Sequence, residues 1–366
     1  MSADGGIGAF AYDLLVGDCG DSLSLCVEDE TVQACVTSPP YWGLRDYGVA
    51  DQLGLEPSPQ QYVERLVLLL REVRRVLRRD GVLWLNLGDC YAGSGRGGHA
   101  GGKSTLDGSH EGQDLSRTAR YVSNQQRDAA VHQRGSRLPA GLHEQARLAG
   151  AVGRAWTPPP AGLKHKDLVG IPWMVAFALR ADGWWLRDEV IWRKPNPMPH
   201  PCRDRTVRAH EQVFLLSKSR RYFFDYRAIE EPIAAASRKR YAQPTVGEQR
   251  GGAKQDAYES GFVGQRARSR RPNEIVAALA EAGQERRRAR SVWDIPTQPY
   301  KDAHFATFPV ELASRCVRAS SKPGDLVLDP FGGAGTTGLA CKNLGRRALL
   351  CELNPDYAEM IHRRLA

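Results

Sequence analysis

The chain has 366 residues, 42% of them hydrophobic, and a formal net charge of +9. This length suits one large α/β domain with an insertion or appendage, and the basic surplus favours a polyanionic partner. The first ten residues lack the basic start and apolar core of a signal peptide, and no apolar run approaches the length of a membrane span. The eight cysteines contain no C-x-x-C pair, which indicates reduced thiols in a cytoplasmic protein and neither a metal site nor a disulfide framework.

The first 90 residues alternate apolar runs with one helical pattern. Residues 14–18 and 34–37 are short apolar runs that we predict as strands, and the first of them ends in Asp18. Apolar side chains recur at helical spacing over residues 59–79, and Asp80-Gly81 ends that helix. Residues 82–87 then form a buried strand. Strands and helices joined by such short links are typical of a parallel sheet.

Two polar, basic stretches interrupt this pattern. Residues 91–165 are rich in Gly, Ser, Gln, His and Arg, and we predict a long mobile loop there. Residues 226–292 are again polar and basic. Between them we expect a helix at 171–181 and strands at 184–193, 211–217 and 221–225. In and after the second stretch we expect helices at 273–282, 304–320, 335–344 and 355–365 and strands at 325–329 and 346–352.

The segment Thr37-Ser38-Pro39-Pro40-Tyr41-Trp42 follows the second predicted strand. A proline cannot donate to a strand ladder, and each one holds the preceding residue out of the helical region. The result is a stiff, extended turn that fixes a side-chain oxygen beside an aromatic face. Such a turn suits a flat polar ligand such as a nucleobase. Taken alone, S-P-P-Y is more often a surface turn with buried rings.

Near the C-terminus, a strand, a glycine-rich turn and a helix start succeed one another over residues 326–338. Glycines permit positive φ angles and a close approach of a ligand to the backbone, and the helix N-terminus favours an anionic group. The next strand ends in Glu352, which is placed to accept hydrogen bonds from a ribose diol. Gly333, Gly335 and Gly338 satisfy G-x-G-x-x-G, so the residues alone leave NAD, FAD, S-adenosylmethionine and a purely structural turn open.

The order of these motifs along the chain resembles that of one family. A first half with Gly-Asp and T-S-P-P-Y-W precedes a second half with F-P-x-x-L and D-P-F-x-G-x-G-T-T. This order resembles the β-class DNA amino-methyltransferases of bacterial and phage restriction–modification systems. The resemblance covers residues 12–90, 163–225 and 300–366.

The resemblance implies a circularly permuted class I methyltransferase fold, which is α/β with a mostly parallel Rossmann-like sheet, helices on both faces and basic insertions. The implied cofactor is S-adenosyl-L-methionine. Residues 1–90, 163–225 and 300–366 would form the catalytic domain, with the base-pocket half first and the cofactor half last. Residues 91–162 would be a mobile basic loop, and 226–299 a target-recognition region.

The family also suggests roles for single residues at the turn. Ser38 and the carbonyl of Pro39 would accept hydrogen bonds from an exocyclic amine, and Pro40 would help to keep the turn stiff. Tyr41 would stack on a base flipped out of the duplex, because the amine is unreachable within the stack. The implied wall of the base pocket consists of Trp42, Trp192 and Lys194, although Trp192 fits a buried core position equally well.

At the cofactor, Glu352 would hold the ribose and Asp18 would accept from the adenine amine. A solvated strand-end carboxylate is the alternative for Asp18, and a helix-capping element is the alternative for Phe308-Pro309. The cofactor contacts implied by the resemblance are Asp18, Thr37, His304, Thr307, Phe308, Pro309, Asp329, Pro330, Phe331, Gly333, Gly335, Thr336, Thr337, Glu352 and Asn354.

The serine before Pro-Pro-Tyr bears on the choice of base. Adenine-N6 members usually carry aspartate there, so Ser38 favours cytosine-N4 methylation, with adenine-N6 methylation as the alternative. Cytosine-C5 methylation needs a thiolate nucleophile, and Pro201-Cys202 lies outside a strand-end context. A dinucleotide-dependent oxidoreductase and a non-catalytic DNA-binding relative are more distant alternatives.

Double-stranded DNA is the expected partner. Arginine binds phosphates and base edges, so both basic stretches, 91–165 and 226–292, are candidates for DNA contact. A solvated loop fits 91–165 as well, and the resemblance favours 226–292, because the family has variable recognition segments between the base-pocket half and the cofactor half. A cognate restriction endonuclease is an expected second partner, and the protein is expected to be a monomer or a homodimer.

Overall fold

The computed structural model describes residues 10–49, 51–93, 159–199, 202–233, 286–298 and 308–366. Within these residues, eight strands form one sheet in the order β1–β10–β9–β2–β3–β5–β4–β8. β5 (His210–Ser217) is antiparallel to both of its neighbours, and every other pairing in this sheet is parallel. The remaining strands are β1 (Tyr12–Val16), β2 (Val32–Thr37), β3 (Leu77–Leu87), β4 (Trp185–Arg193), β8 (Val292–Asp294), β9 (Leu326–Asp329) and β10 (Arg347–Glu352).

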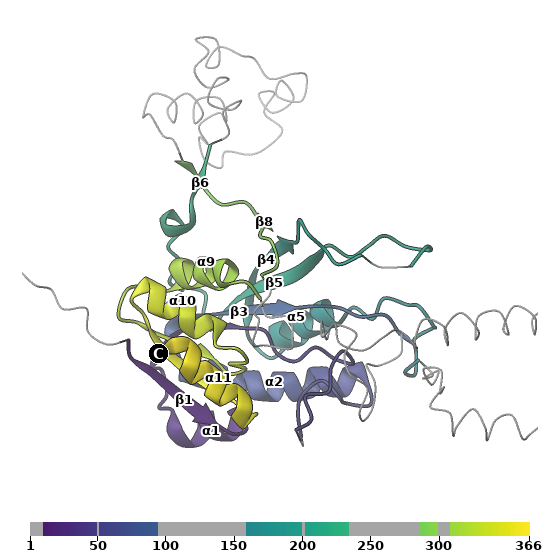
Figure 1. Ribbon diagram of the computed structural model, residues 1–366, viewed down its shortest axis with the longest axis horizontal. Coiled ribbons are helices and arrows are strands. Elements are labelled where there is room, and N and C mark those ends of the chain that lie inside the picture. Colours follow the sequence, from purple (N-terminus) through teal and green to yellow (C-terminus); the bar gives the residue numbers. More distant parts are fainter. Residues whose placement is uncertain (1–9, 50, 94–158, 200–201, 234–285, 299–307) are drawn as a thin grey trace, which may run out of the picture.

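Helices cover both faces of the sheet (Figure 1). One face packs against α1 (Cys19–Cys26), α2 (Pro59–Val76) and α5 (Ile171–Ala181), and the other against α9 (Val310–Ser320), α10 (Thr336–Leu344) and α11 (Pro355–Leu365). Side chains alternate between the two faces, as in β3, where Leu83 and Leu85 join the first core and Val82 and Trp84 join the second. The predicted α/β architecture is therefore confirmed. No helix in the described residues is long and apolar enough to cross a membrane.

Several predicted elements have different ends in the structure. The helix predicted to reach residue 79 ends at Val76, because β3 already begins at Leu77 and pairs with Val32 of β2. The last long helix before the glycine turn begins at Val310 rather than at residue 304. The strand predicted at 221–225 is wrong: Phe223 and Asp225 donate to the separate carbonyls of Asp80 and Ala319, so no ladder forms. The helix predicted at 273–282 lies outside the described residues.

Helix α1 was not predicted, and it begins at a residue assigned to the cofactor. Oδ1 of Asp18 accepts hydrogen bonds from the backbone N–H groups of Gly20 at 2.8 Å and Asp21 at 3.1 Å. This is the geometry of a helix N-cap, which satisfies donors that the first helical turn leaves unpaired. Asp18 therefore has a structural task at the end of β1.

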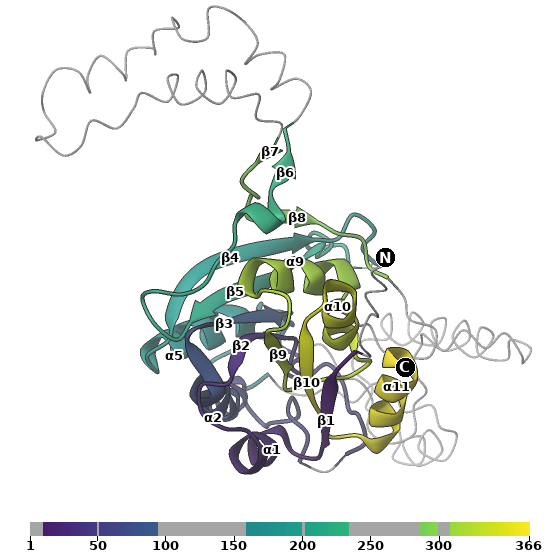
Figure 2. The same ribbon diagram turned by 90° about the vertical axis from the view of Figure 1, so that its left-hand side faces the viewer.

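The segment 226–299 contributes to two parts of the structure. β6 (Glu231–Pro232) and β7 (Arg286–Arg287) pair as a two-stranded arm that projects from the body (Figure 2). β8, by contrast, joins the edge of the main sheet beside β4. Its Trp293 is 2% exposed and lies 5.9 Å from Trp84, measured between ring centroids. The end of the segment predicted for target recognition is thus part of the main sheet.

Replacing Trp293 tests whether β8 is part of the hydrophobic core. Trp293→Ala should lower the free energy of unfolding by about 3–5 kcal/mol, the usual cost of a large buried side chain. Trp185→Ala is the matched control, because Trp185 is 46% exposed, and it should cost about 1 kcal/mol or less. Urea denaturation of both variants measures the difference. Equal losses would show that β8 is not an integral part of the core.

Candidate active site

The predicted S-P-P-Y turn lies at the carboxyl edge of β2, beside three other strands whose side chains become polar at the same edge. On β2, β3, β4 and β5, every second residue packs into the core beneath α9, as Val82 and Trp84 do on β3. The register aligns Asn86 with Val213 and Trp192 with Glu211. At the carboxyl edge of β2, the next residue in each core-facing row is polar. These residues are Ser38 after β2, Asn86 on β3, Lys194 after β4 and Glu211 on β5.

These polar ends form one hydrogen-bonded network. The hydroxyl of Ser38 donates to the phenol oxygen of Tyr41 at 3.0 Å, and the phenol donates to Oε2 of Glu211 at 2.7 Å. Nδ2 of Asn86 donates to the same phenol at 2.7 Å and to Oε2 at 2.9 Å. The ammonium of Lys194 pairs with Oε1 of Glu211. Burial and the neighbouring Glu211 carboxylate raise the pKa of Tyr41 well above its usual value, so the phenol keeps its proton.

The ring of Tyr41 lies against the backbone at the end of β3. A Cβ atom built on Gly88 would lie 2.5 Å from Cε2 of Tyr41 and 2.8 Å from Cδ2. Such an approach is possible only for a residue without a side chain. Gly88 therefore sets how deeply the ring sits beside the Ser38 hydroxyl.

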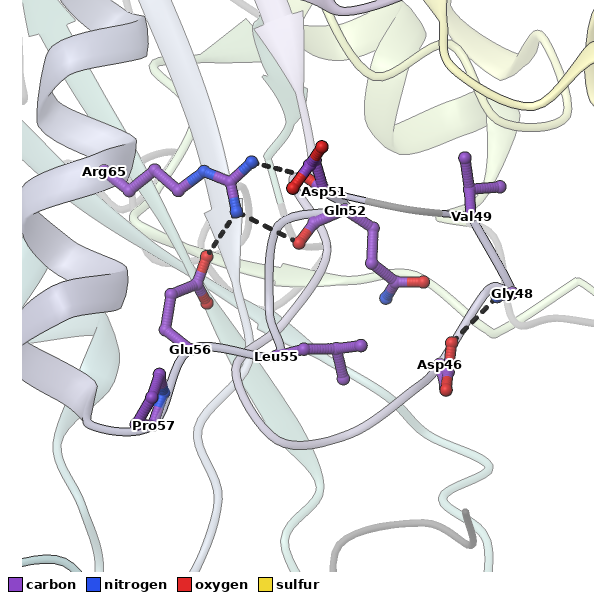
Figure 3. Close-up of a pocket in the computed structure, with 9 residues that line it drawn as sticks. All are labelled: Asp46, Gly48, Val49, Asp51, Gln52, Leu55, Glu56, Pro57 and Arg65. Atoms are coloured by element: carbon purple, nitrogen blue, oxygen red, sulfur yellow. Dashed lines mark hydrogen bonds and ion pairs between the residues drawn. The ribbon is translucent and has the colours of Figure 1, made fainter. Parts of the chain in front are cut away.

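The loop after Tyr41 supports the turn from the other side. Tyr62 donates to the Pro40 carbonyl at 2.9 Å, and the indole N–H of Trp42 donates to the Glu56 carbonyl at 2.9 Å. Arg65 reaches into this loop and pairs with Glu56 at 3.3 Å (Figure 3). A pocket of about 590 Å³ opens here, lined by Asp46, Gly48, Val49, Asp51, Gln52, Leu55, Glu56, Pro57 and Arg65. None of these residues was predicted for the site, and their contacts indicate a support for the turn.

A buried carboxylate joins the turn to the glycine-rich segment. Asp329, at the end of β9, is 1% exposed. Its oxygens accept from the hydroxyls of Thr37 at 2.6 Å and Thr337 at 2.7 Å and from the N–H of Phe331 at 3.1 Å. Burial raises the pKa of Asp329 to about 7 in spite of these donors. Thr37 and Thr337 are thus both hydrogen-bonded to Asp329, and all three residues were predicted for the cofactor.

The glycine turn leaves an open cradle over the strand ends. Gly333 and Gly335 have φ angles of +53° and +71°, which favour glycine. The carboxylate of Glu352 accepts from the N–H of Gly333 at 2.7 Å and of Asn354 at 2.9 Å. A Cβ atom on Gly333 would meet one atom within 4 Å, an oxygen at 3.8 Å. Space beside the backbone, a fixed carboxylate and the half-buried Phe331 fit a nucleoside with a ribose diol.

The edge strand β1 and its neighbour β10 bring a further residue, Asp18, to this cradle. Val16 of β1 pairs with Glu352 of β10, and the N–H of Gly17 donates to the Glu352 carbonyl at 2.9 Å, so Asp18 follows directly beside Glu352. Tyr47 lies in the loop after the turn, where burial raises its pKa; Arg45 opposes this rise and the Glu352 carboxylate adds to it. Tyr47 was not predicted.

The remaining predicted residues lie in the hydrophobic cores, at helix ends, in the Glu211 network or outside the described residues. Trp42 and Trp192 are 4% and 3% exposed and lie in the cores, whereas Lys194 reaches the network and lies 4.5 Å from the Trp192 ring centroid. Pro309 caps α9 and Asn354 caps α11. Phe308 packs on the second core, Pro330 is buried beside Asp329, and Thr336 opens α10. His304 and Thr307 lie outside the described residues.

Asn86 and Glu211 are the two members of the Ser38 network that the sequence did not predict. Both extend an alternating apolar row, and Asn86 is the one polar residue within the run 82–87. A polar side chain on the core face of an apolar strand costs free energy unless it is hydrogen-bonded. That pattern was a usable signal for Asn86. Glu211 stands at a strand end, where a charged residue is ordinary.

The fold and the site define an α/β enzyme that holds a nucleoside-type cofactor at parallel strand ends, beside a hydroxyl–carboxylate network. Comparisons with known proteins identify the family. The DNA methylase family model for N6 and N4 methylation matches residues 32–363. The Type II methyltransferase M.Cfr9I of Citrobacter freundii is 37% identical over 94% of this chain and 86% of its own length. M.SmaI of Serratia marcescens, also a Type II methyltransferase, is 35% identical over 96% and 90%.

A solved structure supports the same fold. The PvuII DNA methyltransferase, described as cytosine-N4-specific, superposes with a TM-score of 0.55 at 15% identity, over 98% of this chain and 87% of its own. The chain belongs to the N6/N4 family of DNA methylases. It has the class I methyltransferase fold, and S-adenosyl-L-methionine is its cofactor. DNA is its substrate. The oxidoreductase alternative is therefore wrong.

Gly88→Ala should displace the Tyr41 ring while leaving the glycine cradle untouched. We expect turnover on DNA to fall by about 10²-fold, since small misplacements of a positioning group have effects of this size. The affinity for S-adenosyl-L-methionine, measured by calorimetry, should stay within about twofold, because Gly88 lies outside the cradle. Wild-type turnover in a folded Gly88→Ala variant would contradict the assigned role of the close contact.

The raised pKa of Asp329 predicts a pH dependence of stability. The ordinary pKa is 3.8 and the folded value is about 7, so this contribution to stability is complete below pH 4 and is lost as the pH rises through 7. Asp329→Asn cannot ionise, and the threonine hydroxyls can rotate to suit an amide. As the pH rises from 4 to 8, the unfolding free energy of the wild type should therefore fall relative to that of the variant. Urea titrations at several pH values measure this, and parallel curves would contradict it.

Proposed function

We propose that the protein transfers a methyl group from S-adenosyl-L-methionine to the exocyclic N4 amine of cytosine in duplex DNA. One observation carries the proposal. Ser38 donates its only hydrogen to Tyr41 at 3.0 Å, so its oxygen keeps lone pairs for an incoming amine. The contact to Ser38 from Asn86 is long, at 3.4 Å. A serine at this place, where aspartate is usual in adenine-N6 relatives, supports cytosine as the base.

The residues around Ser38 have separate tasks in this proposal. The Pro39 carbonyl accepts the second amine hydrogen, and the Tyr41 ring stacks on a base that has left the duplex. Lys194 and the Glu211 carboxylate line the same side of the pocket. With the base fixed by these groups, the amine nitrogen faces the cofactor over the strand ends, and such positioning supplies much of the rate.

The cofactor would lie in the cradle of Gly333, Gly335 and Phe331, with Glu352 toward the ribose. Bound S-adenosyl-L-methionine supplies an electrophilic methyl group. Asp18 has its Oδ1 engaged in capping α1, so a contact with the adenine amine would use the other oxygen. The full set of proposed cofactor residues, His304 and Thr307 included, is the one that the sequence predicts.

We propose that residues 226–299, apart from β8, recognise the target sequence. The arm of β6 and β7 supports this, because it leads away from the body and carries arginines at its base. The guanidinium groups of Arg287 and Arg290 lie 3.5 and 3.4 Å from the Glu231 carboxylate, which orients both groups. The Type II designation of the relatives further supports a cytoplasmic enzyme of a restriction–modification system with a cognate endonuclease.

The reaction product tests the choice of base. Unmethylated bacterial DNA is treated with the enzyme and cofactor, digested to nucleosides and analysed by mass spectrometry. We expect N4-methylcytosine. Ser38→Ala should keep its cofactor affinity but lose turnover by about 10²-fold, because the amine loses an orienting acceptor. N6-methyladenine as the product would overturn the choice of base, and 5-methylcytosine would overturn direct attack by the amine.

A further inference from the structure

The reacting amine must lose a proton, and the site has to provide an acceptor. Methyl transfer leaves a positive charge on the amine nitrogen, and the proton bound there points toward Ser38. A serine hydroxyl is too weak a base to keep that proton. It can accept the proton only if it passes its own hydrogen onward. The hydrogen bond from Ser38 to Tyr41, at 3.0 Å, shows the direction in which that hydrogen leaves.

Two other carboxylates near the S-P-P-Y turn, Asp329 and Asp89, are already occupied by hydrogen-bond donors or cations. Asp329 accepts from two threonine hydroxyls and one backbone N–H. Asp89 accepts from the N–H groups of Gly170 at 2.9 Å and Ile171 at 3.1 Å, at the start of α5, and its other oxygen lies 3.5 Å from Arg208. Glu211 is the carboxylate that the Ser38 network reaches, through the phenol of Tyr41.

We propose that Glu211 is the terminal acceptor of the proton released by the methylated amine, through a relay of Ser38 and Tyr41. The N–H bond of the amine breaks as an O–H bond forms at Ser38. The hydrogen of Ser38 moves to Tyr41, and the hydrogen of Tyr41 moves to Oε2 of Glu211. The base, Ser38 and Tyr41 end uncharged, and Glu211 ends protonated. This inference rests on the proposed attack by an exocyclic amine, whichever base carries it.

The surroundings of Glu211 fit an acceptor that is ready before the reaction. Its side chain is 14% exposed and pairs with Lys194, whose own side chain is 21% exposed. This ion pair stabilises the carboxylate out of water. Asn86 donates to both Tyr41 and Glu211. Its uncharged amide fixes the two oxygens of the relay without adding a second negative charge that would repel the first.

Two substitutions interrupt the relay at different atoms while preserving shape. Glu211→Gln removes the basic oxygen, and Tyr41→Phe removes the hydroxyl but keeps the stacking ring. Each should slow single-turnover methyl transfer by about 10²-fold, within the range for positioned acid–base groups. The double variant should be no slower than the slower single variant, since both act on one path. Cofactor affinity, the KM for DNA and the melting temperature should stay near their wild-type values.

Glu311→Gln is the matched control. Glu311 lies on α9, is 49% exposed and makes ion pairs with Arg315 and Arg318, so its loss should leave the rate unchanged. A rate within threefold of the wild type in Glu211→Gln, or losses that multiply in the double variant, would overturn the relay. Should Glu211→Gln misfold, as judged by melting and cofactor binding, the Tyr41→Phe rate decides alone.

Different experimental results would contradict the proposed base and the proposed proton relay. Methyladenine from the wild-type enzyme overturns the proposed base but leaves the rate ratios to decide the relay. Methylcytosine with a wild-type rate in both variants overturns the relay but leaves the proposed function standing. The absence of any methyl transfer to DNA by the wild-type enzyme would overturn both.

Discussion

The buried carboxylate of Asp329 joins the glycine-rich segment near the C-terminus to the S-P-P-Y turn near the N-terminus. It ends β9 and accepts from Thr37 at the end of β2, 292 residues away along the chain. The hydroxyl of Thr337, at the start of α10, lies 2.7 Å from the other oxygen and 3.1 Å from the Val36 carbonyl, so its single hydrogen is shared between these two acceptors. An unpaired carboxylate at this depth would be too costly to bury. The donors therefore have to come together, and the S-P-P-Y turn and the glycine cradle come together with them.

The boundary between the adjacent strands β9 and β2, where Asp329 lies, is the centre of the candidate site because of how the chain leaves these two strands. Parallel strands all end at one edge, and a ligand can lie over that edge where connections leave in opposite directions. Here β9 and β10 connect through α10, and β2 and β3 through α2, which cover opposite faces of the sheet. The glycine-rich turn therefore lies on one side of the β9–β2 boundary and the Ser38 network on the other.

Much of this arrangement was predictable from local sequence. The period of the apolar residues identified most strands and helices, and the order of two short motifs identified the family. The roles of Asp18 and Trp42 were harder to predict. Asp18 reads as a strand-end carboxylate, and its capping of α1 appears only once the weakly amphipathic residues 19–26 are known to be helical. Trp42 adjoins the catalytic turn in sequence, but its indole N–H is satisfied by Glu56 within the core. Adjacency along the chain does not determine on which side of a stiff turn a ring lies.

The partners of Tyr41 could not be predicted, because they depend on strand pairing over long separations. Glu211 lies 170 residues from Tyr41 and Asn86 lies 45 residues away, and their meeting requires that antiparallel β5 be inserted between β3 and β4. Once that pairing is known, alternation alone brings Ser38, Asn86, Glu211 and Lys194 to one face. The order of the strands therefore brings these four polar residues within hydrogen-bonding distance of one another or of Tyr41.

The carboxylates of this edge differ in what the surrounding fold allows them to do. Asp329 accepts from three donors and its pKa is raised by burial, and it joins β9 to β2 through Thr37. Glu352 is held by two backbone N–H groups, which leave further lone pairs on its oxygens free to accept. Glu211 has a lysine on one oxygen and a phenol on the other. It alone of the three is bonded to a chain of hydroxyls that can exchange hydrogens. The donors that the strand order places around each carboxylate therefore differ: Asp329 is fully hydrogen-bonded, Glu352 is held by backbone N–H groups, and Glu211 is joined to hydroxyls and a lysine, as the proposed relay requires.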